Sequence, residues 1–493
     1  MKPRFLFAII AVSLVGSIQR AGAEEWLQRY HDSMHTNFAN ANTDPLQSIV
    51  FNYPFDPDQQ AALNIHYTDP LIKSNGEMIV PYRDCGGVRC TRLNSVYSVK
   101  KLAPDGTEIW SFTSDWLGFA SNWHAVFGIG VNNGLVYAAG DFGTYWVLNE
   151  ADGSFVNRLS SYPLPEDPSV LRDKVWTTSP PSFDADGNVY WTFRTTLNPL
   201  GLVSSLVKAS PDGTVIAATF GDLAGDTAQV AAVNSTPAIG PDGTVYAVST
   251  TTAQNNSRLL AISPNLDAPA IWNSSLRVDI PAGSPGGPCH EARPINDSTA
   301  SPVILPDGGV VFGGWNSSGG SGCGIGECPV SQGFLYKFDP SGAFQGCYQF
   351  GWDSTPGYFT VGGNSYLVEK HNHYPQPPNP EFYELVVLDG SDLHKVWSYI
   401  EPTNHEWCID GPLVSYNADG SGIVATVPSE AGIFYQVEIY DLGAGAFTDP
   451  TNPPVTTVDL GQPQSAPYVP NVGIGGPAFT INNARILGVG ATP

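Results

Sequence analysis

The chain has 493 residues, of which 46 are acidic and 22 are basic, and its formal charge is -24. A surface this acidic repels phosphate backbones and anionic lipid headgroups, so we expect no nucleic-acid partner and no membrane insertion. Charged residues make up only 14% of the chain, whereas glycine occurs 52 times and proline 42 times. This composition is typical of many short strands joined by tight turns, and it excludes a helical protein.

The first 23 residues are typical of an export signal. Lys2 and Arg4 precede an apolar run at 5–15, and Ala21-Gly22-Ala23 supplies small residues for a cleavage site. The apolar run is too short to span a bilayer as a helix. We therefore expect a secreted or periplasmic protein whose mature chain begins near Glu24, and we expect it to be a monomer.

Next along the chain, residues 24–55 form a lead-in that contains one strand-like stretch, LQSIVFNY at 46–53. The remaining residues, 56–493, show a recurring pattern of short β-rich segments without a linker or a composition break. We expect the stretch at 46–53 to complete the last repeat, because pairing the two ends of the chain removes exposed strand edges.

The repeat is a hairpin whose turn contains Gly, Asn or Asp-Gly and leads directly into a β-rich strand, as in Asp242-Gly243 before TVYAVS. Both central residues of such turns adopt positive φ angles, which matches the twist of the strands. The turns lie at 74–76, 132–134, 186–187, 242–243, 307–308, 362–363, 419–420 and 482–483.

A second set of turns lies between these, at 104–106, 151–153, 211–213, 340–342 and 389–390. Each unit is therefore a strand A, a turn, a strand B, a loop, a strand C, a turn and a strand D. The sequence predicts an all-β fold, a single β-propeller of about eight four-stranded blades closed by an N-terminal strand. Seven blades would result if residues 466–493 only complete an earlier blade.

Several repeats carry a resemblance to a known family. STPAIGPDGTVYAVS followed by LLAISP, and KLAPDGTEIW, resemble the repeats of the pyrroloquinoline-quinone-type (quinoprotein alcohol dehydrogenase-like) β-propellers. In those repeats a tryptophan ends strand D, the place of Trp110, Trp397 and Trp272 here. The opening EEWLQRYHDSMHTN, with Trp26 and the pair His35-Thr36, is similar to the lead-in of these proteins.

The resemblance implies the propeller fold, with functions that range from dehydrogenases to proteins that only bind or organise other molecules. As a dehydrogenase, the chain would hold pyrroloquinoline quinone against Trp123 or Trp176, with Ca²⁺ on Asp297 or Asp353. It departs from that pattern, because the sequence has no adjacent Cys-Cys pair and no C-x-x-C-H haem motif.

In a propeller, the A–B and C–D turns lie on one face, and the B–C loops and D–A connections lie on the other. Here the second face carries the long irregular segments, where binding residues usually lie. We expect a ligand site where the chain enters the A strands around the channel mouth, a site suited to a small molecule, a glycan or a protein segment. Its candidate residues are His66, Trp123, His124, Trp176, Asp297, Asp353, His405 and Glu406.

The sequence also offers a structural interpretation of some of these positions. Asn234-Ser235-Thr236, Asp297-Ser298-Thr299 and Asp353-Ser354-Thr355 repeat the same pattern at the entry to three blades. Such repetition favours turn capping and hydrogen bonding between blades over ligand binding. The histidines do not repeat, so for them both interpretations stay open.

Cysteine spacing predicts two local loop staples. Cys85 and Cys90, and likewise Cys323 and Cys328, bracket four residues in the B–C loop of their blade, and an exported chain favours disulfides. A shared four-thiolate zinc site is the alternative. Three cysteines remain, and the sequence does not pair them: Cys289, Cys347 and Cys408.

We assign no metal site and no catalytic residue. The pair His371 and His373 would face one side of a strand, but no further ligand lies close in sequence. The sequence favours a binding or scaffold protein that uses its loop-rich face. The alternative is a quinoprotein-like oxidoreductase with pyrroloquinoline quinone and Ca²⁺ in the channel mouth.

Overall fold

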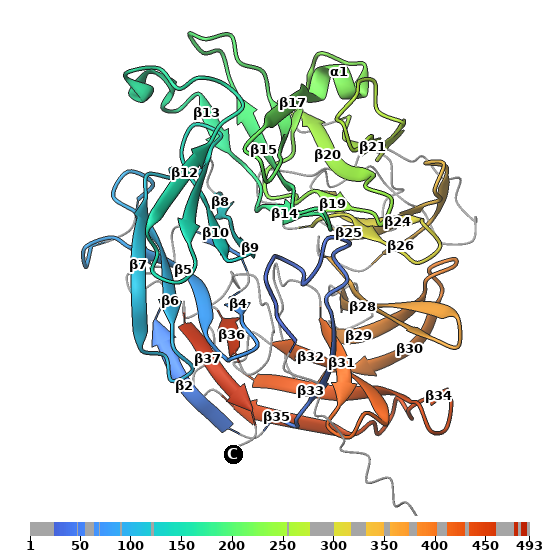
Figure 1. Cartoon of the computed structure of the whole chain (residues 1–493). Helices are drawn as coiled ribbons and strands as arrows, with labels where there is room; N and C mark the ends of the chain where they lie inside the picture. The colour runs from blue at the N-terminus through green and yellow to red at the C-terminus, as the bar shows by residue number, and fades with distance from the viewer. Residues whose placement is uncertain are drawn as a thin grey trace, which may run out of the picture.

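The computed structural model shows a ring of β-sheets arranged like propeller blades (Figure 1). The structure describes residues 24–46, 48–54, 64–68, 70–88, 91–119, 123–253, 256–276, 300–316, 332–349, 355–373, 382–401, 412–428, 433–459, 478–481 and 485–490. Within these ranges, no helix is both long and apolar enough to cross a membrane.

Seven sheets follow one another along the chain, each built around four consecutive antiparallel strands. Blade 1 contains β4 (Leu71–Ile72), β5 (Met78–Asp84), β6 (Val96–Leu102) and β7 (Glu108–Ser114). Blade 2 contains β9 (Ile129–Asn132), β10 (Leu135–Ala139), β11 (Tyr145–Asn149) and β12 (Phe155–Leu159). Blade 3 contains β14 (Ser182–Phe183), β15 (Val189–Thr195), β16 (Ser205–Ala209) and β17 (Val215–Thr219), with β13 (Val175–Thr177) also paired to β15.

Blade 4 contains β19 (Ala238–Ile239), β20 (Val245–Thr251), β21 (Arg258–Ile262) and β22 (Trp272–Ser275), with β18 (Gln229–Ala231) also paired to β20. Blade 5 contains β23 (Val303–Ile304), β24 (Val310–Asn316), β25 (Gln332–Phe338) and β26 (Phe344–Gln349). Blade 6 contains β27 (Gly357–Val361), β28 (Asn364–His373), β29 (Phe382–Asp389) and β30 (Lys395–Ile400).

Blade 7 contains β31 (Leu413–Asn417), β32 (Gly422–Pro428), β33 (Ile433–Asp441) and β34 (Ala446–Phe447), with β35 (Val455–Asp459) also paired to β33. The described helices are two short elements, the 3₁₀ helix η1 (Pro168–Leu171) before blade 3 and α1 (Phe220–Ala224) after β17.

The eighth blade joins the two ends of the chain. It contains β36 (Ala478–Ile481), β37 (Arg485–Gly490) and the N-terminal strand β2 (Ser48–Pro54), which pairs antiparallel with β37. The fold is therefore an eight-bladed propeller, and the prediction that the stretch at 46–53 closes the ring is confirmed. In Figure 1 the blue β2 lies beside the red β37.

The hairpin turns form where the sequence places them. Gly76, Gly134, Gly187, Gly243 and Gly308 all have φ angles between +74° and +82° at the A–B turns of blades 1 to 5. The turns at 362–363 and 419–420 also contain glycine with positive φ. The turn at 482–483 lies outside the described residues. Local turn chemistry therefore sets the repeat.

Tryptophans at strand D connect three pairs of neighbouring blades, as their repeated position predicts. The indole N–H of Trp110 donates a hydrogen bond to the Glu150 carbonyl of blade 2 at 3.0 Å. Trp272 donates to the Pro340 carbonyl of blade 5 at 3.0 Å, and Trp397 donates to a carbonyl of blade 7 at 2.9 Å. Each indole thus fixes the turn of the next blade.

The lead-in, residues 24–37, follows the inner edge of the ring and bonds one inner strand after another. Its residues contact blades 1 to 7 in order, through backbone N–H groups that would otherwise face the channel without a partner. The bonds link Trp26 with Ile72, Leu27 with Val131, Gln28 with Phe183, Ser33 with Ile239, Met34 with Ile304, Thr36 with Tyr358 and Asn37 with Val414.

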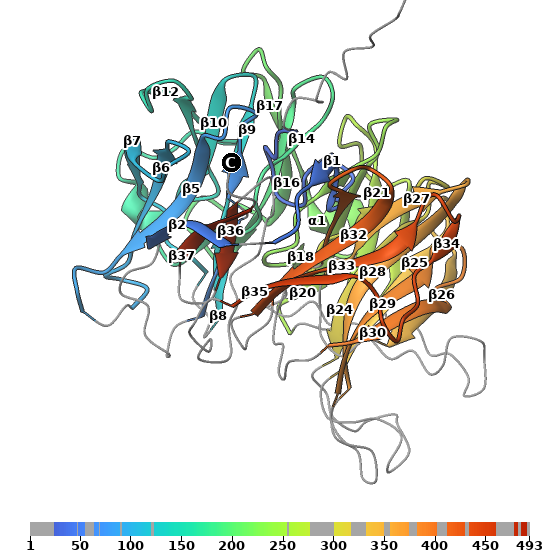
Figure 2. The same cartoon turned by 90° about the horizontal axis from the view of Figure 1, so that it is seen from below.

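The chain then continues as β1 (Phe38–Thr43), which pairs in parallel with β31 of blade 7, and β2 enters blade 8. Residues 24–54 therefore contact every blade. Figure 2 shows β1 and β8 (Trp123–Phe127) toward opposite faces of the ring. We call the side of β1 the tight-turn face and the other side the loop-rich face.

Candidate functional site

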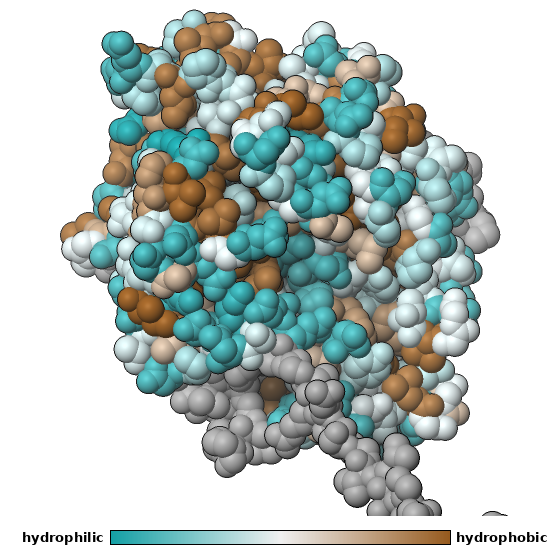
Figure 3. Space-filling model, in the orientation of Figure 1, coloured by the Kyte–Doolittle hydropathy of each residue, from teal (hydrophilic) through white to brown (hydrophobic). Residues whose placement is uncertain are grey.

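The lead-in fills the centre of the ring on the tight-turn face. Arg29, Tyr30 and His35 are completely buried there. The guanidinium carbon of Arg29 lies 4.6 Å from the centroid of the Tyr30 ring, and the His35 ring lies 5.0 Å from it on centroids. The dark blue trace crosses the middle of the ring in Figure 1, and largely hydrophilic residues cover this region in Figure 3.

Two histidines of the lead-in have pKa values shifted in opposite directions. Burial by itself would lower the pKa of His31, but hydrogen bonds to Asp32 and Glu24 outweigh burial and raise the pKa to about 9. Burial lowers the pKa of His35 to about 4, and its neutral Nδ1–H donates to the Pro302 carbonyl at 2.8 Å. At neutral pH the lead-in thus holds one charged and one neutral imidazole.

On the loop-rich side, the strands that carry three predicted site residues run side by side. β3 (Asn64–Tyr67) contains His66, and β8 contains Trp123 and His124. The two strands pair in parallel, with Asn64 opposite Trp123 and Ile65 opposite His124. These strands lead into blades 1 and 2, and their pairing places His66 and His124 on adjacent strands. The site at the channel mouth stays a prediction.

Asn234 connects these strands to the rest of the channel. Its side-chain oxygen accepts a hydrogen bond from the backbone N–H of Val126 at 2.7 Å, and its own N–H donates to the Thr178 carbonyl at 2.8 Å. Its carbonyl accepts a bond from Nη1 of Arg29 at 3.3 Å. Asn234 is completely buried and adopts a φ of 70°. This confirms the structural interpretation for Asn234, which joins three parts of the channel wall.

Hydroxyl groups continue this network between blades. The Ser301 hydroxyl accepts a hydrogen bond from the Thr236 N–H at 2.9 Å, and the Thr355 hydroxyl accepts one from the Ser301 N–H at 2.9 Å. Asn37 of the lead-in donates to the Thr355 carbonyl at 3.4 Å. Thr236, Ser301 and Thr355 therefore connect blades 4, 5 and 6; Thr236 and Thr355 belong to the repeated pattern, and Ser301 follows it by two residues. The hydroxyls of Ser235 and Thr236 are buried without a partner among the described residues.

Trp176 lies in β13 and is only 4% exposed. Its ring contacts Phe119 edge-on, with the centroids 4.9 Å apart. Its buried indole N–H has no hydrogen-bond partner in the described part of the chain. A buried indole without a partner costs free energy unless water or a ligand accepts its hydrogen bond. Trp176 thus offers a hydrogen-bond donor, but its ring is too buried for a ligand to stack on it.

A charged cluster lies on the loop-rich face of blade 2, at residues that the sequence did not indicate. Asp141, in the B–C loop, is 2% exposed. One of its carboxylate oxygens accepts the Phe142 N–H at 2.9 Å, and the other is buried without a hydrogen-bond donor among the described residues. Burial, together with repulsion from Asp115, raises the pKa of Asp141 to about 7, although Arg172 and Arg92 oppose the shift.

Asp115 occupies a different environment in the same cluster. Its carboxylate accepts hydrogen bonds from the Asp141 N–H at 3.1 Å and the Trp146 indole at 2.9 Å, and it forms an ion pair with Arg158 at 2.9 Å. The two carboxylates are therefore held differently, one paired and one desolvated. The sequence carried no signal for this contrast, because the buried environment of Asp141 comes from segments far apart in the chain.

The remaining candidates are only partly described. Asp297, Asp353, His405 and Glu406 lie outside the described residues, as do Cys90, Cys323 and Cys328. Cys85 and Cys347 are both disulfide-bonded. The pairings Cys85–Cys90 and Cys323–Cys328 stay predictions. In β28, Nδ1 of His371 shares a hydrogen bond of 3.0 Å with the Tyr348 hydroxyl.

Comparison with known proteins gives the fold. No protein-family model matches the sequence, and no curated protein matches it significantly. Among solved structures, a quinohemoprotein alcohol dehydrogenase from Pseudomonas putida HK5 has 13% identity and a TM-score of 0.56, over 95% of this chain and 81% of that one. The corresponding enzyme from Comamonas testosteroni has 11% identity and a TM-score of 0.52, over 97% and 82%.

A europium-containing methanol dehydrogenase has 12% identity and a TM-score of 0.51, over 86% of this chain and 84% of that one. The chain therefore has the β-propeller fold of the pyrroloquinoline-quinone type, as the repeats indicate. At these identities the likeness is one of fold.

Proposed function

We propose that this protein is an exported binding propeller that holds a small molecule, a glycan or a protein segment at the mouth of its channel on the loop-rich face. One observation supports the proposal: the lead-in fills the tight-turn side of the channel, whereas β3 and β8, the strands that contain His66, Trp123 and His124, pair with each other on the opposite side. A rigid ring with one mouth and convergent polar groups is a common form of ligand site.

Buried donors near the blade entries support this proposal. The Trp176 indole and the hydroxyls of Ser235 and Thr236 lack partners among the described residues. Most buried polar groups in proteins are hydrogen-bonded, so unpaired donors at the entries of blades 3 and 4 are suited to a ligand or to ordered water. Polar acceptors on a ligand, such as carbonyl or hydroxyl oxygens, would satisfy them.

The test is binding of a defined oligosaccharide and peptide panel to the mature protein, followed by tryptophan fluorescence and by thermal shift. We expect Trp123→Ala and His66→Ala to weaken binding of the selected ligand at least about tenfold, as for residues at the centre of an interface. The melting temperature of each unliganded variant is measured alongside.

His394→Ala serves as the matched control. His394 is 58% exposed, lies near the C–D turn of blade 6 and interacts with Asp392. Its removal changes a histidine on the other face, so binding should stay within about twofold. Equal losses in His66→Ala and His394→Ala, or full binding by Trp123→Ala, would argue against a site at the mouth.

The alternative function is a quinoprotein-like oxidoreductase, and the fold neighbours favour it. Trp176 does not fit a stacking role, because its ring is buried against Phe119. Trp123, with Ca²⁺ on Asp297 or Asp353, would then hold the planar quinone.

Titration with pyrroloquinoline quinone and Ca²⁺ distinguishes the two proposals. Saturable stabilisation together with dye-linked oxidation of alcohols or sugars would support the oxidoreductase. If neither stabilisation nor oxidation is observed, the oxidoreductase is ruled out and the binding protein remains the proposed function.

A further inference from the structure

The two faces of blade 7 differ in polarity. Ile423, Ala425 and Val427 of β32 are buried in one apolar cluster with residues of blade 6, and so are Tyr435 and Val437 of β33. Strand alternation directs the residues between them to the opposite face. That opposite face carries Thr426, Gln436 and Glu438, together with Val424.

The end of β1 and the residues that follow it cover part of this polar face. Asn42 donates a hydrogen bond to the Ala418 carbonyl at 3.1 Å, and the Thr43 hydroxyl donates to the Ser415 hydroxyl at 2.7 Å. The Leu46 N–H donates to the Thr456 hydroxyl of β35 at 3.3 Å. Residues 42–46 are therefore fixed at both ends above blade 7.

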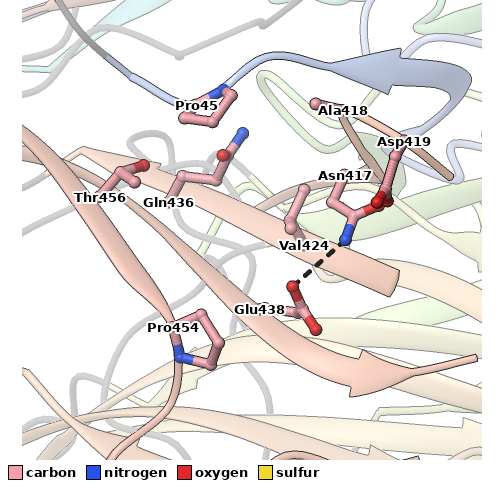
Figure 4. Close-up of a pocket in the computed structure, with 9 residues that line it drawn as sticks. All are labelled: Pro45, Asn417, Ala418, Asp419, Val424, Gln436, Glu438, Pro454 and Thr456. Carbon is pink, nitrogen blue, oxygen red and sulfur yellow. Dashed lines mark hydrogen bonds between the residues drawn. The ribbon is translucent and has the colours of Figure 1, made fainter. Parts of the chain in front are cut away.

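A pocket of about 260 Å³ remains beneath this segment (Figure 4). It is lined by Pro45, Asn417, Ala418, Asp419, Val424, Gln436, Glu438, Pro454 and Thr456. Its volume lies below the usual range of sites for drug-sized ligands, so it suits a molecule the size of one sugar ring. The site lies at the A–B turn of blade 7, on the face opposite the loop-rich mouth.

Gln436 is the polar group at the centre of the pocket wall. It is 5% exposed, and its side chain points toward Pro45 (Figure 4). Its amide nitrogen donates to the Thr426 hydroxyl at 3.4 Å, whereas no described residue donates to its amide oxygen. The oxygen is therefore free to accept a hydrogen bond from a ligand in the pocket.

The other polar groups also favour a ligand that donates hydrogen bonds. Glu438 accepts a hydrogen bond from Asn417 at 3.2 Å, and Asp419 lies at the rim. The described lining residues include two carboxylates and no lysine, arginine or histidine, so they disfavour an anion. Pro45, Pro454 and Val424 supply apolar walls.

We propose that this pocket is a second binding site, independent of the loop-rich mouth, for a small polyhydroxylated molecule that carries an ammonium group, such as an amino sugar. The ammonium group donates to Glu438 and to the oxygen of Gln436, and the hydroxyl groups bond Thr456 and Asp419. The proline rings pack against the carbon skeleton. Binding fixes residues 42–46 to blade 7 and therefore stabilises the closed ring.

The test measures binding of glucosamine, glucose and gluconate by calorimetry and by thermal shift. We expect glucosamine to bind saturably and raise the melting temperature, glucose to bind at least about fivefold more weakly, and gluconate not to bind. Glu438→Gln and Gln436→Leu should each weaken glucosamine binding about tenfold or more, because each removes an acceptor of a hydrogen bond from the charged ammonium group.

Asp186→Asn is the matched control, since Asp186 is an exposed acid in the equivalent turn of blade 3. It should leave glucosamine binding within about twofold. Asp419→Asn changes an exposed rim residue without disturbing the core, and it should weaken binding severalfold even if Gln436→Leu fails to fold. Equal affinity for glucose and glucosamine, no saturable glucosamine binding, or equal losses in Asp186→Asn and Glu438→Gln would overturn the proposal.

Discussion

The backbone N–H of Val414, in the inner strand of blade 7, donates a hydrogen bond to the carbonyl of Asn37 at 2.9 Å. This bond is the last of the series that begins between Trp26 and Ile72 in blade 1. The ring is therefore held from the inside by one irregular segment as well as by the strand pairing in blade 8. Each of blades 1 to 7 bonds a different residue of that segment, so the position of the segment relative to the inner strands is fixed.

The first prediction concerns the lead-in. Tyr30 is completely buried at the centre of the ring, and Tyr30→Ala should lower the free energy of unfolding by about 3–5 kcal/mol, as for other large-to-small aromatic changes. Leu197 is the control because it is 96% exposed. Leu197→Ala should change the free energy of unfolding by less than about 0.5 kcal/mol. Urea denaturation measures both. Similar midpoints for the two variants would show that the lead-in does not hold the ring.

The second prediction concerns the tryptophan contacts between blades. Gly342 has a φ of 82°, and a Cβ there would lie 2.5 Å from the Trp272 ring. Gly213 has a φ of 87° with nothing within 4 Å of its Cβ position. Gly213→Ala should lower the free energy of unfolding by about 1–2 kcal/mol through backbone conformation alone. Gly342→Ala should lower it by about 1–3 kcal/mol more, because the added methyl group overpacks the contact. Equal decreases in melting temperature for the two variants would mean that the Trp272 ring moves aside at little cost in free energy.

The third prediction concerns Asp141, whose pKa rises from 3.8 to about 7 in the folded protein. Because the folded state binds its proton more tightly than the unfolded state, the contribution of Asp141 to stability falls as pH rises from about 4 to about 7 and is constant above. A pKa difference of this size limits the loss of stability to at most about 4 kcal/mol. Asp141→Asn should remove this contribution, so the difference in unfolding free energy between the parent and the variant should change with pH between about 4 and 7; urea unfolding at several pH values measures it, and the contributions of other groups cancel in that difference. An unchanged slope would contradict the assignment to Asp141.

The fourth prediction concerns the two lead-in histidines. The pKa of His31 is raised to about 9, so the stability that His31 contributes to the fold is complete below pH 6.5 and is lost as pH rises toward 9. The pKa of His35 is lowered to about 4, so its contribution is complete above pH 6.5 and is lost as pH falls toward 4. His31→Gln should flatten only the alkaline limb of the stability profile, and His35→Gln only the acidic limb. The reverse pattern would exchange the two assignments.

Local chemistry explains what could be predicted from the sequence. Turns such as Asp242-Gly243 encode their own geometry, so the blade repeat and its approximate number follow from them. The closing strand was predictable because a propeller leaves no free edge. Trp110, Trp272 and Trp397 were predictable from their repeated place in strand D.

The path of the lead-in was not predictable, because all but one of its bonds to the inner strands use backbone groups, and the side chain of Gln28 alone leaves no recognisable pattern. The raised pKa of Asp141 was equally hidden, since loops of different blades bury it. The sequence predicted that His66 and His124 lie where the chain enters the blades around the channel mouth; the structure pairs the strands that contain them, β3 and β8. The roles of these side chains stay predictions.

The pairing of β2 with β37 also has a consequence for the order in which the molecule forms. The ribosome makes residues 48–54 before blades 1 to 7 and residues 485–490 after them, so β2 has no partner while those seven blades are synthesised. Blades 1 to 7 can assemble in the order in which they emerge, but the circle cannot close until residues 485–490 have been made. The protein is thus most exposed to unwanted strand pairing during that interval, and a chain stopped before residue 485 would never leave it.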